Sequence, residues 1–556
     1  MSTHCRVSSA THGSHWHLIN WRYCHRRVKK LQLRIAKATQ EQQWRKVKAL
    51  QRMLTRSFSA KALAVKRVTE NTGRKTPGVD GEIWQHPESK WSAITRLKRS
   101  GYHPLPLRRI YIPKANGKFR ALGIPTMLDR AMQALYLMAL EPLSEITADH
   151  HSYGFRPMRS TADAIEQVFN ACGKKASAEW ILEGDIRGCF DNLSHEWLVS
   201  HILMDRMVLR NWLKSGYCEG MSFYPTKGGT PQGGIISPTL MNMALDGLQS
   251  LLERRFPSTT VQGRKAKIHL VRYADDFVIT GATAELLRND VMPIVIDFLA
   301  ERGLMLSPEK TRIVNIKQGF DFLGQNIRKY KGKLLIKPSR MNLKNFLHKI
   351  RSIIEKNKAS PAWLLISQLN PVIRGWVNYH RHVVAKKMFR YIDHQIWLKV
   401  WQWCVRRHPK KGKRWIRNKY FTTIGMRNWV FNGNDGMNRK YTLFKADSTP
   451  IKRHTKIKAI ATPYDPKWES YFERRQDYIL ENAIWGKKRL LAIWKSQGSL
   501  CPICRQRITH ETGWNVHHKV KKVMGGGEEL SNLVLLHPNC HRQLHSCEAG
   551  SLKKGL

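Results

Sequence analysis

Two adjacent carboxylates, Asp275 and Asp276, lie between two short runs of apolar residues in the segment 271–279. Apolar runs on both sides predict a strand, a tight turn and a returning strand, with the carboxylates at the tip. Burying two carboxylates in this way is unfavourable unless a cation neutralises them. A hard divalent metal held by oxygen ligands is the obvious cation, so the segment predicts a metal site.

A third carboxylate, Asp185, ends another apolar run. Three carboxylates can hold two magnesium ions, which activate a primer hydroxyl and stabilise the leaving pyrophosphate in nucleotidyl transfer. The alternative is a solvated Asp-Asp turn, which is what most such dipeptides form. The apolar residues on both sides of Asp275 and Asp276 favour the metal site.

At these residues the chain resembles a reverse transcriptase, because the Tyr-Ala-Asp-Asp box at 273–276 and the acidic strand around Asp185 match the palm of that family. More closely, it is similar to the multifunctional reverse transcriptase and maturase encoded within group II introns. Further matching blocks follow in that family's order, at 111–133, 152–164, 183–192, 228–242 and 303–324. The resemblance covers nearly the whole chain.

This resemblance implies an α+β multidomain fold. Its parts are right-hand polymerase fingers and palm, an α-helical thumb (maturase) domain, a basic DNA-binding region and a small zinc-stabilised HNH domain of the ββα-metal type. The expected limits are 1–75 for a basic N-terminal extension, 76–335 for fingers and palm, 336–404 for the thumb or maturase domain X, 405–484 for the DNA-binding domain and 485–556 for the HNH endonuclease domain.

The charge of the chain indicates its partners. Lysine and arginine number 96 against 41 acidic residues, a formal charge of +55, which is typical of a folded protein that binds nucleic acid. A membrane-surface protein is the alternative, but no apolar run is long enough to span a bilayer and the N-terminus has no apolar signal core, so no membrane partner is expected. The cysteines are scattered except near the C-terminus, which favours a reducing cytosol and a metal site.

Residues 109–124 predict a β-hairpin that turns at Asn116-Gly117. In the resembled family, the residues that match Lys114 and Arg120 grip the incoming triphosphate. A two-residue turn would place these side chains on opposite faces of the hairpin, so two surface cations are the alternative.

Two more residues match nucleotide-binding positions of the family. Phe190 stands where the family places a ring under the sugar, which would exclude a ribose 2′-hydroxyl; a core phenylalanine on a strand is the alternative. Gln232 lies in a glycine- and proline-rich loop, whose backbone can approach a ligand closely. We expect one helix at 161–171 before these residues and one at 238–252 after them.

After Gly324 helical spacing replaces the strand pattern. Met388, Ile392, Ile396 and Val400 predict one apolar helix face, which is either a plain bundle core or the family's RNA-binding thumb. Residues 404–419 are rich in lysine and arginine and have aromatic neighbours, a mixture suited to nucleic acid, although most charge runs are simply solvated.

The C-terminal segment contains two ligand pairs, each with a two-residue spacer: Cys501 with Cys504, and His537 with Cys540. This spacing predicts a tetrahedral zinc site that stabilises a small module. The segment resembles the HNH nuclease family, which often has four cysteines at these positions, so His537 is a departure from that pattern.

Four further histidines and one asparagine match the HNH pattern. In that family the residue matching His518 is the base that activates water, those matching His517, His541 and His545 surround one divalent ion, expected to be Mg²⁺, and Asn532 braces the loop. A zinc finger without catalysis is the alternative, but it would not need these additional histidines.

The resemblance therefore implies a group II intron protein that is an RNA-directed DNA polymerase, a maturase and a DNA endonuclease. Its partners would be the intron RNA, double-stranded target DNA, an RNA template with a DNA primer, and deoxynucleoside triphosphates. It would act in the cytoplasm, at the nucleoid, as a ribonucleoprotein. The alternatives are a noncatalytic RNA-binding splicing factor and a retron-like or defence-associated polymerase; the latter usually lacks this nuclease.

Overall fold

The structure is a computed structural model that describes residues 13–113, 117, 119–483, 488–509, 512–520, 525–527 and 529–552. Lys114, one of the two predicted triphosphate-binding cations, lies outside the described residues. Among the described helices, none is both long enough and apolar enough to cross a bilayer.

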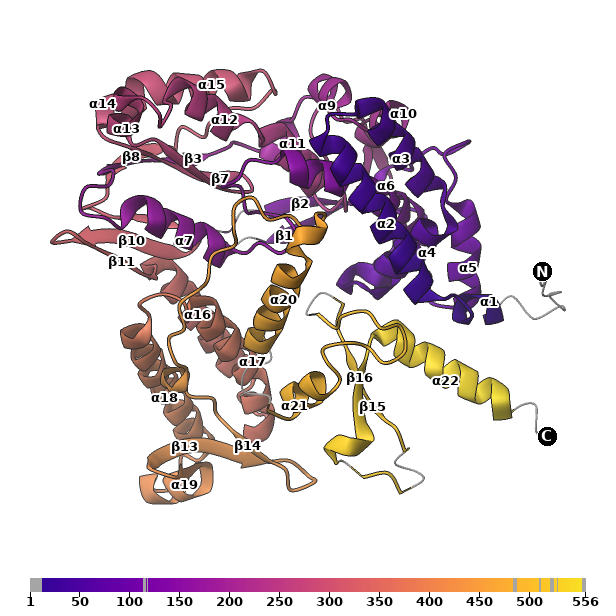
Figure 1. Ribbon diagram of the computed structural model, residues 1–556. Helices are drawn as coiled ribbons and strands as arrows, with labels where there is room; N and C mark the ends of the chain where they lie inside the picture. The colour runs from indigo at the N-terminus through magenta and orange to yellow at the C-terminus, as the bar shows by residue number, and fades with distance from the viewer. Residues whose placement is uncertain are drawn as a thin grey trace.

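A four-stranded antiparallel sheet lies at the centre of the reverse transcriptase-like part (Figure 1). Its order is β6 (His269–Tyr273), β7 (Asp276–Gly281), β3 (Trp180–Asp185) and β8 (Arg312–Asn315). The hairpin predicted at 271–279 is confirmed, since β6 pairs with β7 and the chain turns at Ala274 and Asp275.

Side chains of the central sheet alternate between two hydrophobic cores. Leu270, Phe277 and Ile279 pack with the N-terminal helices, whereas Val271 and Val278 pack with the maturase-like helices. Successive residues of a strand point to opposite faces, so this sheet is buried on both sides.

The helices next to the sheet agree only partly with the prediction. Helix α7 (Thr161–Cys172) lies within one residue of the expected limits. The single helix expected at 238–252 is wrong: α11 (Ser237–Leu245) and α12 (Leu248–Arg255) are separated by Asp246, which is extended, and Gly247, whose φ is 100°. The break follows from tertiary contact, because the Asp246 carboxylate is an ion-pair partner of the buried Arg272.

A second sheet has the order β2-β1-β4-β5 and contains the hairpin predicted at 109–124. β1 (Leu107–Pro113) pairs with β2 (Phe119–Ile124), with Ile112 opposite Arg120. This register is one residue away from that of a plain two-residue turn. Asn116 lies outside the described residues, so the turn at Asn116-Gly117 stays a prediction. The sheet also pairs β1 in parallel with β4 (Tyr217–Glu219), which is hydrogen-bonded to β5 (Ser222–Tyr224).

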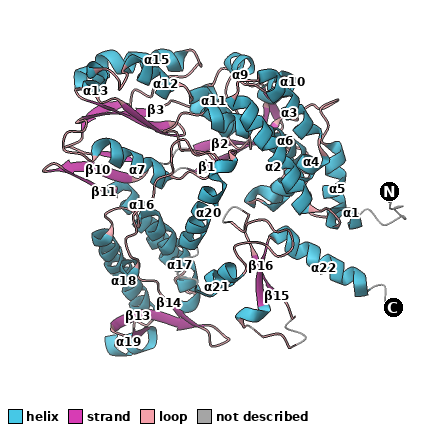
Figure 2. Cartoon of the chain, viewed as in Figure 1, coloured by secondary structure: helices cyan, strands magenta, loops and turns pink. Residues whose placement is uncertain are grey.

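Helices of the N-terminal part form a layer beside the sheet (Figure 2). Serine, threonine or asparagine side chains at Asn20, Ser57 and Thr126 accept a backbone N–H and so start three of these helices. The layer contains α1 (Gly13–His17), α2 (Trp21–Gln40), α3 (Trp44–Arg56), α4 (Phe58–Glu70), α5 (Pro87–Arg96) and α6 (Met127–Thr147).

The maturase-like part consists of a small sheet, with β10 and β11 labelled on the left of Figure 1, and three long helices labelled below them. The sheet is β9 (Phe320–Phe322), β10 (Gln325–Tyr330) and β11 (Lys333–Pro338), and the helices are α16 (Arg340–Lys356), α17 (Ala362–His380) and α18 (Lys386–Arg407). The apolar face predicted for α18 is confirmed at Ile392, Ile396 and Val400, but Phe389 is buried where Met388 was expected.

The basic segment that follows forms α19 (Lys413–Tyr420) and a small antiparallel sheet of β12 (Phe421–Ile424), β13 (Arg427–Asn434) and β14 (Lys440–Thr442). Helices α20 (Glu469–Ala483) and α21 (Lys488–Ser496) then lead to an antiparallel pair, β15 (Asn515–His518) and β16 (Leu533–Leu536), and to α22 (Pro538–Leu552). Short helices between β3 and β8 complete the fold: α8 (Cys189–Asn192), α9 (His195–His201), α10 (Arg206–Leu213), α13 (Val261–Ala266), α14 (Ala284–Leu286) and α15 (Met292–Ala300).

One buried carboxylate, Asp163 on α7, joins the sheet layer to the segment before α20. Its Oδ1 accepts hydrogen bonds from His454 Nε2 at 2.8 Å, Ile457 N at 2.8 Å and Arg475 Nη2 at 2.5 Å. Its Oδ2 accepts from Ser160 N at 2.9 Å, which caps the helix. Burial alone would raise the pKa of Asp163, but His454, Arg475 and the Ile457 N–H outweigh it and lower the pKa to about 2.

We expect Asp163→Asn to destabilise this junction by about 3 kcal/mol, since it leaves Arg475 buried without its counter-charge. Because the folded pKa is depressed, the stabilisation by Asp163 is present above the unfolded value of about 4 and is lost as pH falls from about 4 to about 2. Urea unfolding and proteolysis of the 446–470 segment measure the effect. The control Glu179→Gln removes an exposed ion pair with Lys317 and should cost less than about 1 kcal/mol; equal unfolding of the two variants would contradict the prediction.

Candidate polymerase and nuclease sites

The three predicted carboxylates converge at one edge of the central sheet. Asp185 ends β3 and is the cross-strand partner of Asp276, the first residue of β7, while Asp275 is in the turn just before it. All three line a cavity of about 710 Å³. The same cavity is lined by Arg120, Phe190 and Gln232, so six predicted residues from distant parts of the chain meet there.

The charge in this cavity is unfavourable without a cation. Burial, followed by the neighbouring charges of Asp275 and Asp185, raises the pKa of Asp276 to about 6. Burial also raises the pKa of Asp275, and Asp185 adds to the effect. Hard divalent cations prefer such clustered oxygen ligands, so the donor set fits a divalent metal.

A lysine that the sequence argument did not single out contributes to this site. Lys310 Nζ donates to both carboxylate oxygens of Asp185, at 3.0 and 2.9 Å, and this contact raises the pKa of Lys310. Lys310 lies in a turn inside the matching block 303–324, but nothing in its local pattern distinguishes it from a solvated lysine. Only the pairing of β3 with β8 brings it to Asp185.

The turn that holds Asp275 has little room to move. Ala274 has a φ of 59°, a left-handed conformation that is uncommon for a residue with a side chain. Gly154 lies against it so closely that an added Cβ would be 2.3 Å from Ala274 N. The segment before α7 is held against β6, since Ser152 forms a bridge with Arg272 and Tyr153 N donates to Arg272 O at 2.9 Å.

Phe190 is not on a strand, in contrast to the core-strand alternative. It lies on α8, after Gly188, whose φ of 54° turns the chain out of β3. Its ring is half-buried, contacts Phe155 edge to face at 6.3 Å and lines the cavity. Gln232 lies across the cavity, and its backbone carbonyl accepts from Gly123 N at 2.8 Å, which connects the glycine-rich loop to β2.

The C-terminal cysteines and His537 form a compact, buried group. One ligand atom from each of Cys501, Cys504, His537 and Cys540 lies within 4.8 Å of the others. His537 Nε2 donates to the Arg507 carbonyl at 3.1 Å, which leaves Nδ1, 3.2 Å from Cys504 Sγ, as the lone-pair nitrogen facing the sulfurs. Hydrogen bonds from Cys504 and Cys540 lower the pKa of Cys501. A tetrahedral metal fits this set of four ligands.

A second group is formed by His517 on β15 and His541 and His545 on α22, again with ligand atoms within 4.8 Å of one another. His518 is the next residue of the same strand, so its side chain points to the other face and is outside this group. Asn532 holds the loop after His518: its Oδ1 accepts from Val520 N at 2.7 Å, and its Nδ2 donates to Gly527 O at 2.8 Å.

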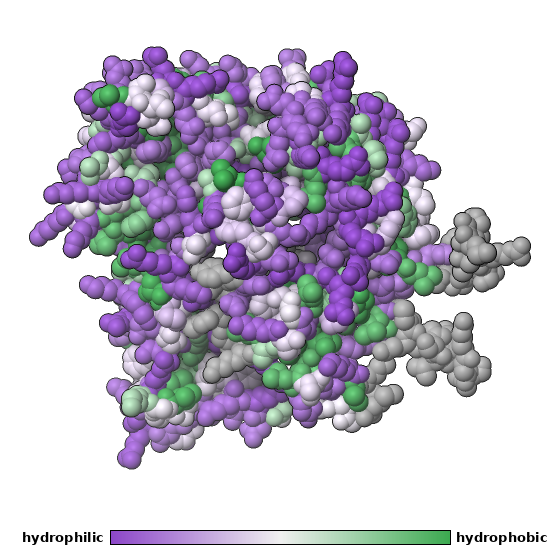
Figure 3. Space-filling model, viewed as in Figure 1, coloured by the Kyte–Doolittle hydropathy of each residue, from purple (hydrophilic) through white to green (hydrophobic). Residues whose placement is uncertain are grey.

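The basic segment presents cations together with tryptophans. Lys419 Nζ lies 4.7 Å from the Trp415 ring centre, and the Arg417 guanidinium lies 4.9 Å from that of Trp429. The two tryptophans are 39% and 38% exposed. Figure 3 shows that most of the visible face of the protein is hydrophilic, as the charge of +55 requires.

Four family models match the chain in succession. They are the N-terminal domain of reverse transcriptase at 16–97, reverse transcriptase (RNA-dependent DNA polymerase) at 112–327, the group II intron maturase-specific domain at 343–421 and HNH endonuclease at 501–546. The chain is therefore a multidomain reverse transcriptase of mixed α/β structure with maturase and HNH domains.

Curated relatives agree with this class. Protein YkfC of Escherichia coli is 34% identical over 306 residues, which is 48% of this chain and 79% of that protein. Group II intron-encoded protein LtrA of Lactococcus lactis is 29% identical over 411 residues, 57% of this chain and 68% of that protein. An uncharacterized 91 kDa protein in the cob intron of Schizosaccharomyces pombe is 26% identical over 372 residues, 53% of this chain and 46% of that protein.

The chain belongs to the family of group II intron-encoded reverse transcriptases and maturases that carry a C-terminal HNH endonuclease domain. Its activities are RNA-directed DNA polymerisation, intron maturation and HNH endonuclease cleavage. A noncatalytic splicing factor is not favoured.

We expect Cys504→Ser to release about one metal ion per chain and to unfold the C-terminal module, because a closed four-ligand site stabilises a module too small for a sufficient core. Metal analysis and proteolytic mapping of residues 488–552 measure the change. The control is Cys218→Ser, a half-buried cysteine on β4 that is remote in the fold from the four-ligand group. Retention of the full metal content by Cys504→Ser would contradict a four-ligand site.

Proposed function

We propose that Asp185, Asp275 and Asp276 are the metal-binding catalytic carboxylates of the polymerase, and that the metal is Mg²⁺. The observation that carries this proposal is their convergence, from two paired strands and a constrained turn, in one cavity with Arg120, Phe190 and Gln232. When bound, two Mg²⁺ ions would activate the primer hydroxyl and stabilise the leaving pyrophosphate.

The other cavity residues bind and select the nucleotide in this proposal. Arg120 supplies a permanent positive charge to the triphosphate, and Gln232 positions the nucleotide from the glycine-rich loop. Phe190 lies under the sugar and excludes a 2′-hydroxyl. Lys114 remains the predicted partner of Arg120.

For the HNH domain we propose a structural Zn²⁺ held by the Cys501, Cys504, His537 and Cys540 group. A divalent ion, Mg²⁺, is assigned to the group of His517, His541 and His545. His518 is the general base, because a neutral imidazole takes a proton from water near pH 7. Asn532 supports the loop that follows His518, as its bonds to Val520 and Gly527 require.

These activities fit one pathway. The maturase domain binds the group II intron RNA in a cytoplasmic, nucleoid-associated ribonucleoprotein, and the HNH domain nicks double-stranded target DNA. The new 3′-hydroxyl is the primer from which the polymerase copies the RNA template with deoxynucleoside triphosphates. The exposed tryptophans and cations of the basic segment support contact with the target DNA.

The domain limits remain proposals: 1–75, 76–335, 336–404, 405–484 and 485–556. Two of these domain limits fall inside a secondary-structure element: β11 continues past residue 335, and α18 continues past residue 404. The maturase domain therefore shares a strand with the part before it and a helix with the part after it, so separating the chain at either position would break an element.

We expect Asp275→Asn to lower the rate of primer extension by at least about 10²-fold, because loss of a group that stabilises transition-state charge has an effect of this order. Binding of intron RNA should stay unchanged. Primer extension and filter binding on one preparation measure both properties. The control is Asp290→Asn, an exposed aspartate outside the cavity. Normal extension by Asp275→Asn would refute the metal assignment.

We expect His518→Ala to lower cleavage of duplex DNA by about 10²- to 10⁴-fold, because no base remains to deprotonate water. The variant should still extend a primer on a target that is supplied already nicked, since polymerisation uses Asp185 and Asp275. Val516→Ala, an exposed residue on the same face of β15, is the matched control. Cleavage at the normal rate would show that His518 is not the base.

A further inference from the structure

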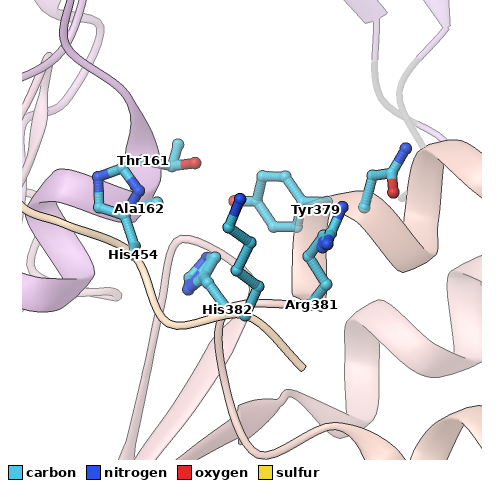
Figure 4. A pocket seen from close by; sticks show the side chains of 8 residues that line it. Thr161, Ala162, Tyr379, Arg381, His382 and His454 are labelled. Carbon is cyan, nitrogen blue, oxygen red and sulfur yellow. The ribbon is translucent and has the colours of Figure 1, made fainter. Parts of the chain in front are cut away.

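A cavity of about 190 Å³ lies where three distant segments meet: the N-terminus of α7, the last turn of α17 with the residues that follow it, and the segment before α20. Figure 4 shows Thr161 and Ala162 on one side of it, Tyr379, Arg381 and His382 on the other, and His454 on the third segment. None of the described residues that line it is acidic. The cavity is several times larger than the volume of about 30 Å³ that a water molecule occupies.

Two of the lining side chains carry a positive charge at neutral pH. The Arg381 guanidinium is always protonated and only 6% of this residue is exposed, whereas Lys452 is exposed at the entrance. Their segments are fixed to each other, because Lys452 N donates to the Arg381 carbonyl at 2.9 Å. Two cationic side chains therefore line one small cavity, an arrangement of charge that favours an anion in it.

Neutral donors complete the lining. Burial, followed by the charge of His454, lowers the pKa of His382 to about 4, so at neutral pH its imidazole offers an N–H rather than a charge. Thr161 and Ala162 are the first residues of α7, beside a capping box in which Ser160 accepts the Asp163 N–H and the Asp163 carboxylate accepts the Ser160 N–H. Backbone N–H groups at the start of a helix have no carbonyl partner within it. The positive end of the helix dipole also lies there.

Asp163, in the first turn of α7, is engaged by His454, Ile457 and Arg475 on the side of the junction. Its contact with His454 fixes that imidazole as part of the cavity wall. The cavity is thus a rigid, cationic site built from the reverse transcriptase, maturase and connecting segments.

We propose that this cavity is a phosphate-binding site, separate from the polymerase cavity, at the junction of the reverse transcriptase and maturase domains. Two sources supply the group: the sugar–phosphate backbone of an RNA strand that crosses the junction, and free pyrophosphate. Tyr379, in the last turn of α17, is fixed on the cavity wall because its hydroxyl donates to the Leu323 carbonyl at 2.7 Å.

The test compares Thr161→Glu with Thr161→Gln in the full-length protein. Both side chains have the same size, and a carboxylate at the first position of a helix is favourable for folding. Only the glutamate places a negative charge in the cavity. A second comparison uses Lys452→Gln, which removes a cation from the cavity lining. Its control is Arg453→Gln, which removes a neighbouring exposed cation outside the lining.

Binding of single-stranded RNA is measured over a range of KCl concentrations, and binding of pyrophosphate by calorimetry. If RNA is the source, Thr161→Glu should weaken RNA binding about tenfold relative to Thr161→Gln and reduce the slope of log K against log salt by about 0.7, the loss of one phosphate contact. If pyrophosphate is the source, only the calorimetric affinity falls, again about tenfold.

The proposal would be overturned if Thr161→Glu and Thr161→Gln bind RNA equally and pyrophosphate equally, and if Lys452→Gln and Arg453→Gln also bind both ligands equally. The polymerase assignment fails separately, through Asp275→Asn. Primer extension by the control Arg453→Gln at the normal rate, and equal thermal unfolding of Thr161→Glu and Thr161→Gln, show that the variant proteins are folded.

Discussion

The position of the turn that holds Asp275 depends on one buried ion pair, between Arg272 on β6 and Asp246. Arg272 is 1% exposed and donates to Asn242 Oδ1 at 3.2 Å and to the carbonyl of Ala274 at 3.4 Å. Removing either partner would leave an uncompensated buried charge, which is costly. The same pair ends α11 at Asp246, so a helix boundary and the placement of Asp275 have a common cause.

The central sheet separates two hydrophobic cores, and each core contains different parts of the chain. The N-terminal helices and the C-terminal cysteines belong to one core, and the maturase helices belong to the other. Trp16 Nε1 donates to Asn539 Oδ1 at 3.3 Å, and Arg542 lies 3.7 Å from Glu70, so the HNH domain is docked on the N-terminal helices. Nuclease and polymerase therefore occupy connected parts of one packed structure.

Acidic residues are scarce in this chain, and the structure concentrates several of them in buried positions. Glu145 accepts from Arg156 at 2.8 Å and from Arg159 at 2.7 Å, and Asp163 makes a comparable set of contacts. These carboxylates neutralise internal cations, whereas most lysines and arginines stay at the surface for nucleic acid. Asp185, Asp275 and Asp276 instead line one shared cavity, which distinguishes the proposed metal site from these structural ion pairs.

The sequence by itself determined the hairpin at 271–279, α7, the apolar face of α18 and the Cys501, Cys504, His537 and Cys540 group, because each depends on local periodicity or ligand spacing. The group of His517, His541 and His545 was indicated by the resemblance to HNH nucleases, and the structure brings these three side chains together. Only the tertiary structure decided the break after Leu245, the register of Ile112 with Arg120 and the contact of Lys310 with Asp185. Those features depend on partners far away in the chain, whose charge and packing override local preference, and no local pattern of residues contains that information.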